Sequence, residues 1–304
     1  MKDIVIRFHK MHGLGNDYVY INGFENERVL ADLTAEELAE MARKAANRNF
    51  GIGSDGLILI LPSDKADCRM RMFNSDGSES EMCGNGVRCV AKYVYESGIA
   101  SKDEITVETG AGVLTLQLTA QDSEVQSVRV NMGQPRLAAA DIPVKLDPAI
   151  ALPKPTMLSL PQDVVMRYPL EILDRTFEIT CVSMGNPHCV IFVDDVEKFP
   201  IEKYGPAIET HEIFPKRTNV EFISVADSQH VIQRTWERGA GETLACGTGA
   251  SAVCVASVLN DRTCRRMQVR LKGGELNLEW AGNGEVLMTG PASHVFSGTW
   301  RVSL

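Results

Sequence analysis

Several features that would place a protein in a membrane, at a nucleic acid or outside the cell are missing from this 304-residue sequence. It contains no run of about 18 apolar residues, so no transmembrane helix is expected. The segment 1–12 is charged and strand-like and lacks the apolar core of a signal peptide. The net charge of −9 argues weakly against a nucleic-acid partner. We therefore expect a cytoplasmic globular protein with no membrane or nucleic-acid partner.

Closely spaced metal-ligand pairs are also absent. The eight cysteines are scattered along the chain and do not form such pairs, so we expect no zinc site. In a cytosolic protein these thiols stay reduced. Five of them lie in apolar runs and are expected to be small buried residues: Cys68, Cys89, Cys181, Cys189 and Cys254.

Two other cysteines each open a glycine-rich turn. Cys246-Gly247-Thr248-Gly249 leads into small and apolar residues that continue to Leu259, and Cys83-Gly84-Asn85-Gly86 leads into a similar run. A cysteine in this position lies at a helix N-terminus, where free N–H groups and the helix dipole favour an anion. We therefore expect a lowered thiol pKa at both sites. For either cysteine alone, a buried structural role would be the simpler interpretation.

Each Cys-Gly turn has a Gly-Asn dipeptide upstream of it at similar spacing, Gly15-Asn16 in the first half and Gly185-Asn186 in the second. This repetition predicts an internal duplication, and the strand-rich pattern predicts an α+β fold with mostly antiparallel sheet. We expect one half over 1–135, joined by a C-terminal strand within 286–304, and the other over 136–285. Seven prolines fall in 134–170, so we expect the proline-rich segment 136–175 to be an extended surface segment that connects the halves.

Two thiols facing each other across a cleft suit inversion at a carbon that carries an acidic hydrogen. A thiolate would remove the proton from one face while a thiol returns one to the other face. His188 and Glu237 could tune the thiols, although a turn histidine and a surface carboxylate are the simpler interpretations. Arg238 could bind a carboxylate. Neutral polar groups for a zwitterionic substrate would come from Asn16, Asn74, Asn186 and Asn219.

The chain closely resembles the diaminopimelate epimerase family in several ordered motifs. They are Gly13 to Tyr18, Phe73 to Cys89, Met184 to His188, Thr218 to Phe222 and Glu237 to Gly249. The resemblance implies two pseudo-symmetric domains, each a strongly curved sheet around a central helix, in a protein that is commonly dimeric. Gly56 departs from the family, because some members have a substrate-contacting Gln there. Phe296 stands where some members have a dimer-interface Tyr.

The resemblance implies a cofactor-independent isomerase that interconverts LL- and meso-2,6-diaminoheptanedioate in lysine and peptidoglycan precursor biosynthesis. Cys83 and Cys246 would be the acid–base pair, with His188 and Glu237 modulating them. The diamino-dicarboxylate substrate would be bound by Asn16, Asn74, Gly84, Asn85, Asn186, Asn219, Glu237, Arg238, Gly247 and Thr248.

Two other hypotheses remain open. The same two-cysteine chemistry could racemise another amino acid, of the histidine or proline/hydroxyproline type. A thiol-redox or anion-binding protein could use the same turns, and it would form a reversible Cys83–Cys246 disulfide without exchanging any α-hydrogen.

Overall fold

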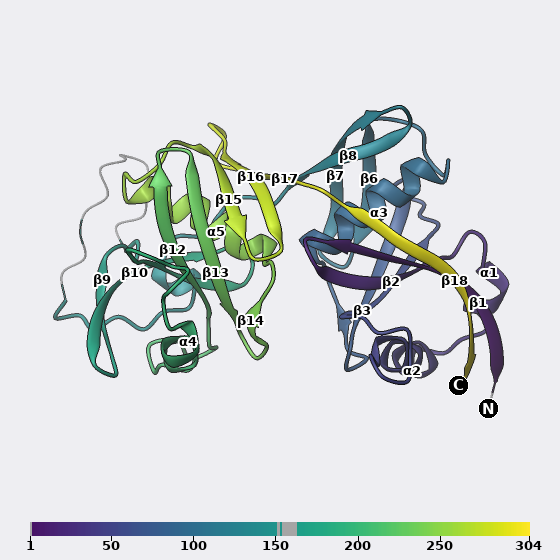
Figure 1. Cartoon of the computed structure of the whole chain (residues 1–304), viewed down its shortest axis with the longest axis horizontal. Coiled ribbons are helices and arrows are strands. Elements are labelled where there is room, and N and C mark those ends of the chain that lie inside the picture. Colours follow the sequence, from purple (N-terminus) through teal and green to yellow (C-terminus); the bar gives the residue numbers. More distant parts are fainter. Residues whose placement is uncertain (1, 151–152, 154–162) are drawn as a thin grey trace. The chain divides into compact units, whose positions relative to one another are not determined.

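The computed structural model describes residues 2–150, 153 and 163–304, which form two compact units. Unit 1 comprises Met1–Val130 and Gly290–Leu304, and unit 2 comprises Asn131–Thr289. Figure 1 shows the sheet and the helices of each unit. None of the helices in the described part of the chain is long and apolar enough to cross a membrane.

Unit 1 is built on a mixed sheet. Its strands are β1 (Asp3–Gly13), β2 (Asn16–Asn22), β3 (Gly56–Leu61), β4 (Cys68–Asn74), β5 (Glu79–Ser80), β6 (Glu104–Thr109), β7 (Gly112–Gln121), β8 (Glu124–Asn131) and β18 (Ser293–Ser303). They pair in the order β18–β1–β2–β3–β4–β6–β7–β8, and β5 also pairs with β4. Only β2–β3 and β4–β6 are parallel among these pairs. The helices are α1 (Glu27–Ala31), α2 (Ala35–Ala46) and α3 (Gly84–Glu96).

Unit 2 repeats this plan. Its strands are β9 (Tyr168–Ile172), β10 (Arg175–Ser183), β11 (Pro187–Phe192), β12 (Asn219–Asp227), β13 (His230–Glu237), β14 (Gly241–Thr243), β15 (Arg266–Leu271), β16 (Gly274–Trp280) and β17 (Val286–Gly290). They pair in the order β9–β10–β11–β12–β13–β15–β16–β17, with β14 also on β13. The parallel pairs are β11–β12 and β13–β15. The helices are η1 (Ala139–Asp141), α4 (Ile201–Glu209) and α5 (Gly247–Leu259).

The strands of the two units match one to one, which confirms the predicted duplication and the α+β fold class. Parallel and antiparallel pairs follow in the same order, with α2 and α4 after equivalent strands and α3 and α5 after the short strands β5 and β14. The C-terminal β18 pairs with β1 in unit 1 as β9 pairs with β10 in unit 2.

Each sheet curves around one helix. Helix α3 contacts β1, β2, β4, β6 and β7, and α5 contacts β10, β11, β12, β15 and β16. Side chains of a strand alternate between the two faces of a sheet. Leu57 and Leu59 therefore pack in the core that includes α2, while Ile58 faces Gly86 of α3. In unit 2 the residue that faces α5 in this way is Glu221.

The proline-rich segment differs from the prediction wherever the structure describes it. Ile142 and Val165 are fully buried in the core of unit 2, and β9 is part of its sheet. An extended surface segment is therefore wrong for these parts. Pro169 lies within β9, which pairs with β10, and a proline is tolerated in a strand where its missing N–H is not needed. Residues 151–152 and 154–162 of the predicted segment lie outside the described residues.

Candidate active site

Both cysteines of the Cys-Gly turns are N-caps, as predicted. Cys83 precedes α3 and Cys246 precedes α5, both with an extended backbone. The Gly86 N–H donates to Cys83 Sγ at 3.3 Å, and the Gly249 N–H donates to Cys246 Sγ at 3.3 Å. Each sulfur thus accepts one of the N–H groups that the first turn of a helix leaves without a carbonyl partner.

The surroundings of Cys83 are dominated by neutral polar groups. Cys83 Sγ lies 3.5 Å from Asn16 Oδ1, which also accepts a hydrogen bond from Asn85 Nδ2 at 3.3 Å. The Tyr18 hydroxyl faces the thiol, and its own pKa is raised by burial and by the nearby sulfur. Unit 1 therefore brings two predicted substrate ligands, Asn16 and Asn85, into contact at the first cysteine.

The predicted lowering of the thiol pKa values is wrong. Loss of water raises the pKa of Cys83, and hydrogen bonds from the Gly86 N–H and the Tyr18 hydroxyl only partly oppose this. Burial also raises the pKa of Cys246, and the carboxylates of Glu237 and Glu221 raise it further. Desolvation disfavours the charged form of a buried group, and here it outweighs the helix N-terminus.

A chain of polar contacts connects Cys246 to a buried carboxylate. Thr248 Oγ1 lies 3.4 Å from Cys246 Sγ and accepts a hydrogen bond from Asn186 Nδ2 at 3.3 Å. Asn186 Oδ1 lies 3.0 Å from His188 Nε2, and His188 Nδ1 lies 2.8 Å from Glu221 Oε1. His188 and Glu221 are both completely buried. His188 therefore reaches the thiol through Asn186 and Thr248.

The other predicted residues of unit 2 lie where β12 begins and β13 ends. Asn219 Nδ2 donates to the Pro187 carbonyl at 2.9 Å, and its Oδ1 accepts from the Arg238 N–H at 3.0 Å. The exposed Arg238 side chain donates to the Lys216 carbonyl at 3.0 Å. Glu237 Oε1 accepts from the Thr243 hydroxyl at 2.6 Å, and its charge reaches Cys246.

Asn74 is the counterpart of Glu237 in unit 1, because each precedes its cysteine by the same number of residues at the end of equivalent strands. Asn74 Nδ2 donates to Ser78 Oγ at 3.0 Å. Gly84 and Gly247 begin the two helices. Phe296 lies on β18 with 46% of its surface exposed, and its ring packs edge-on against Phe8.

Three residues at the site were not found from the sequence: Tyr18, Asp55 and Glu221. Tyr18 follows Gly15-Asn16 as His188 follows Gly185-Asn186, so aligning the two repeats would have found it. Glu221 is a carboxylate inside an apolar strand, and this pattern by itself indicates a buried charged group with a partner. Asp55 Oδ2 accepts a hydrogen bond from Asn16 Nδ2 at 2.8 Å, and no local pattern in the sequence indicates this contact.

The comparisons with known proteins agree with these motifs. The model of the family described as diaminopimelate epimerase matches residues 8–138 and 180–295. The diaminopimelate epimerase of Acetivibrio thermocellus is 52% identical over 294 residues, which are 96% of this chain and 98% of that protein. The chain belongs to the diaminopimelate epimerase family. The predicted isomerase class is therefore confirmed.

Another relative and two solved structures extend the comparison. The diaminopimelate epimerase of Desulfovibrio desulfuricans is 52% identical over 300 residues, covering 98% of this chain and 99% of that one. A phenazine biosynthesis protein of the PhzF family from Bacillus anthracis is 19% identical, with a TM-score of 0.68 and full coverage of both chains. A hydroxyproline epimerase from Agrobacterium vitis is 15% identical, with a TM-score of 0.65 over 99% of this chain and 92% of that one. At these identities the two structures show that the fold is shared.

Proposed function

We propose that the protein interconverts LL- and meso-2,6-diaminoheptanedioate, with Cys83 and Cys246 as its acid–base pair. One sulfur, as thiolate, takes the α-hydrogen as a proton, and the other, as thiol, delivers a proton to the opposite face of the carbon. The proton count is unchanged and the two sulfurs exchange roles. The observation that carries this proposal is the matched placement of both cysteines as helix N-caps in a duplicated member of this family.

The substrate contacts are part of the same proposal. The first N–H groups of α3 and α5, at Gly84, Asn85, Gly247 and Thr248, suit a carboxylate, which a helix N-terminus favours. Binding there would also stabilise the negative charge that grows on the carboxylate as the α-proton leaves. We assign the remaining ammonium and carboxylate groups of the substrate to Asn16, Asn74, Asn186, Asn219, Glu237 and Arg238. His188 and Glu237 modulate Cys246.

Deuterium exchange tests the proposal. In deuterated water with LL-diaminopimelate, the wild-type protein should place deuterium at the α-carbon while meso product forms. Cys83→Ala and Cys246→Ala should each reduce turnover by about 10³-fold, because each removes one of two proton-transfer groups. Cys264→Ala, at an exposed cysteine, is the control and should keep full activity. Substantial epimerisation by either Cys83→Ala or Cys246→Ala would contradict two-base chemistry.

A panel of other amino acids separates the remaining alternative. Exchange on histidine, proline or hydroxyproline, without exchange on diaminopimelate, would favour a racemase of another amino acid. The relatives that share about half of this sequence carry the diaminopimelate epimerase name, which supports our choice of substrate.

We further propose that the two units are the two halves of the epimerase and that the protein is a cytoplasmic homodimer. The eight cysteines are all free, which suits a reducing compartment. Val295 and Phe296 on β18 are exposed by 53% and 46%, and exposed apolar residues beside one another suit an interface between subunits.

A further inference from the structure

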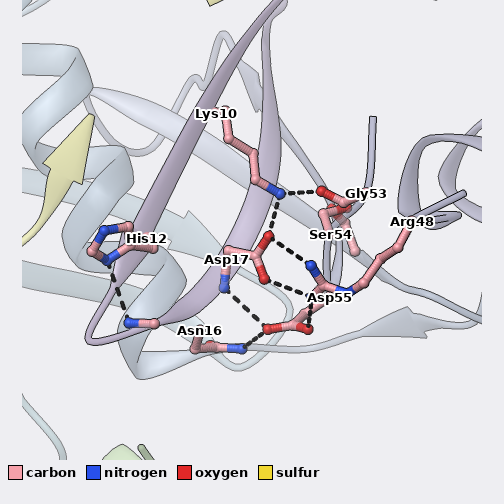
Figure 2. Close-up of polar contacts among 10 residues, drawn as sticks. Lys10, His12, Asn16, Asp17, Arg48, Gly53, Ser54 and Asp55 are labelled. Atoms are coloured by element: carbon pink, nitrogen blue, oxygen red, sulfur yellow. Dashed lines mark hydrogen bonds and ion pairs between the residues drawn. The ribbon is translucent and has the colours of Figure 1, made fainter. Parts of the chain in front are cut away.

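The side-chain amide of Asn16 is held at both ends. Its Nδ2 donates to Asp55 Oδ2 at 2.8 Å, as Figure 2 shows. Its Oδ1 lies 3.5 Å from Cys83 Sγ and accepts a hydrogen bond from Asn85 Nδ2 at 3.3 Å. The amide therefore spans the distance between a carboxylate on one side and the candidate catalytic thiol on the other.

Asp55 is itself fixed by a network of charges (Figure 2). The Asp17 N–H donates to Asp55 Oδ2 at 3.0 Å, and Arg48 Nη2 donates to Asp55 Oδ1 at 2.8 Å. Arg48 also donates to Asp17 Oδ1 at 2.8 Å. Lys10, which is almost completely buried, donates to the Asp17 carboxylate and to the Gly53 carbonyl. The loop before β3 thus has several anchors, and the carboxylate of Asp55 has little freedom to turn.

An ionised carboxylate only accepts hydrogen bonds, whereas an amide has one end that donates and one that accepts. The Asp55 carboxylate therefore selects the NH₂ end of Asn16. We propose that Asp55 is a positioning residue that fixes the orientation of the Asn16 amide, so that its carbonyl oxygen faces Cys83. The inference rests on the proposed function for its consequence in turnover, because Asn16 and Cys83 are assigned to the reaction there.

In the second unit the matching amide has its other end toward the cysteine. Asn186 Oδ1 lies 3.0 Å from His188 Nε2, and Asn186 Nδ2 donates to Thr248 Oγ1, next to Cys246. Strand register places Thr218 where unit 1 has Asp55, since Gly56 pairs with Tyr18 as Asn219 pairs with His188. Asp55 therefore belongs to the first half alone, and the two halves offer opposite ends of an asparagine amide at their cysteines.

Several groups on neighbouring elements face Cys83 and influence how readily its thiolate forms. They are the Tyr18 hydroxyl on β2, the buried Arg88 on α3 and the amides of Asn16 and Asn85. In this proposal Asp55 acts on the thiol through Asn16, and its negative charge also raises the pKa of Tyr18, whose hydroxyl faces the thiol. The experiment must separate orientation from charge, and two substitutions at the same position do so.

Asp55→Asn removes the charge but retains an oxygen that can accept from Asn16 Nδ2, whereas Asp55→Leu removes both. We expect Asp55→Asn to keep most of the wild-type kcat/KM. Asp55→Leu should lose about 10²-fold, mainly in kcat, because a misplaced group at the reacting centre has an effect of that order. Asp67→Leu is the matched control, since Asp67 is a carboxylate of unit 1 that binds Thr106 and Lys102 away from Asn16.

A second readout follows the thiol directly. The pH midpoint of iodoacetamide alkylation at Cys83, mapped by peptide mass spectrometry, should fall further in Asp55→Leu than in Asp55→Asn. Both variants lose the negative charge of Asp55. In Asp55→Leu the Asn16 amide is also released, so it can turn its NH₂ toward Cys83 Sγ and stabilise the thiolate. The exposed Cys264 is an internal standard in the same sample. Thermal unfolding of each variant identifies a general loss of structure.

The outcomes distinguish the two proposals. Equal losses in Asp55→Asn and Asp55→Leu would assign the effect to charge, and wild-type behaviour of Asp55→Leu would remove any role; both results overturn the positioning proposal. If wild-type protein exchanged no α-hydrogen of diaminopimelate, the proposed function would fall. The alkylation midpoints would still decide the orientation of Asn16.

Discussion

At the scale of single residues, the duplicated site differs most at one position of the sheet. Ile58 in unit 1 and Glu221 in unit 2 occupy equivalent register positions and face the third residue of α3 and of α5. A buried carboxylate costs free energy unless it is hydrogen-bonded, and Glu221 has His188 for one oxygen. Its other oxygen, Oε2, has no partner among the described residues. Such a residue is expected to serve the neighbouring thiol rather than stability.

Glu221→Gln should lower the pH midpoint of Cys246 alkylation. Glutamine keeps the shape and an acceptor for His188, but it removes a negative charge that raises the pKa of Cys246. With that charge gone, the thiolate forms at lower pH. Residue-mapped alkylation across pH 6–11 measures the shift.

Two comparisons control this prediction. Cys83 lies in the other unit and should keep its midpoint in Glu221→Gln. Glu242→Gln removes a half-buried carboxylate of unit 2 that pairs with Arg234 and Lys272, and it should leave Cys246 unchanged. An unchanged Cys246 midpoint in Glu221→Gln would show that the carboxylate does not act on the thiol.

At the scale of elements, the two helices that begin after Cys83 and Cys246 pack against different kinds of side chain. The first turn of α3 meets an apolar side chain of β3, whereas the first turn of α5 meets a buried polar cluster. Gln233 and Thr235 on β13 belong to this cluster and are hydrogen-bonded to each other at 2.8 Å. A glycine at each contact allows the helix to approach the sheet closely.

Gly249→Ala should therefore destabilise the protein more than Gly86→Ala. A new Cβ at Gly249 would lie 2.7 Å from Glu221 Oε1 and 3.2 Å from Gln233 Nε2, which are held in place by other contacts. At Gly86 it would lie 2.7 Å from the Ile58 Cδ1 atom, the movable end of a side chain. We expect a loss of about 1–3 kcal/mol in the free energy of unfolding for Gly249→Ala.

For Gly86→Ala, the gain in helix propensity of up to about 1 kcal/mol should offset most of the overpacking. Urea unfolding of both variants and wild type measures the difference. Equal losses in the free energy of unfolding for Gly249→Ala and Gly86→Ala would mean that Glu221 and Gln233 move aside as easily as Ile58 does, which would contradict this prediction.

At the scale of the whole molecule, the C-terminal strand completes the N-terminal unit. β18 pairs along nearly the full length of β1, from Asp3 opposite Ser303 to His12 opposite Ser293. It occupies the position that β9 takes beside β10 within unit 2. The first unit therefore requires both ends of the chain, and the proposed dimer surface lies on the strand that closes it.

Phe296→Asp should convert the proposed dimer to a monomer, because a charge buried at an apolar interface without a partner is strongly unfavourable. Sedimentation equilibrium measures the mass. Val113→Asp is the control: Val113 on β7 is exposed by 47%, about as much as Phe296, and lies away from β18. An unchanged mass for Phe296→Asp, with thermal unfolding as in wild type, would place the interface elsewhere or exclude a dimer.

Much of the fold could be predicted because its signals are local. Helix α5 runs from Gly247 to Leu259, as the run of small and apolar residues after Cys246 predicts. Thr34 and Glu37 form a capping box at the start of α2, which is another signal between neighbours in sequence. The predicted burial of five cysteines is also confirmed. The strand Tyr168–Ile172 was missed because a proline disfavours a strand in a sequence-based prediction. Its pairing with β10 is visible only in the tertiary structure.

The sequence by itself determined the duplicated architecture, the family and the two cysteines that begin α3 and α5. Repeats, caps and glycine turns depend on residues that are close together along the chain, so they can be recognised from the sequence. Only the tertiary structure decided the electrostatic setting of those thiols and the partners Asp55 and Glu221. Desolvation and side-chain contact depend on strands that are distant in sequence, and it is their register that brings a carboxylate to an asparagine or a histidine.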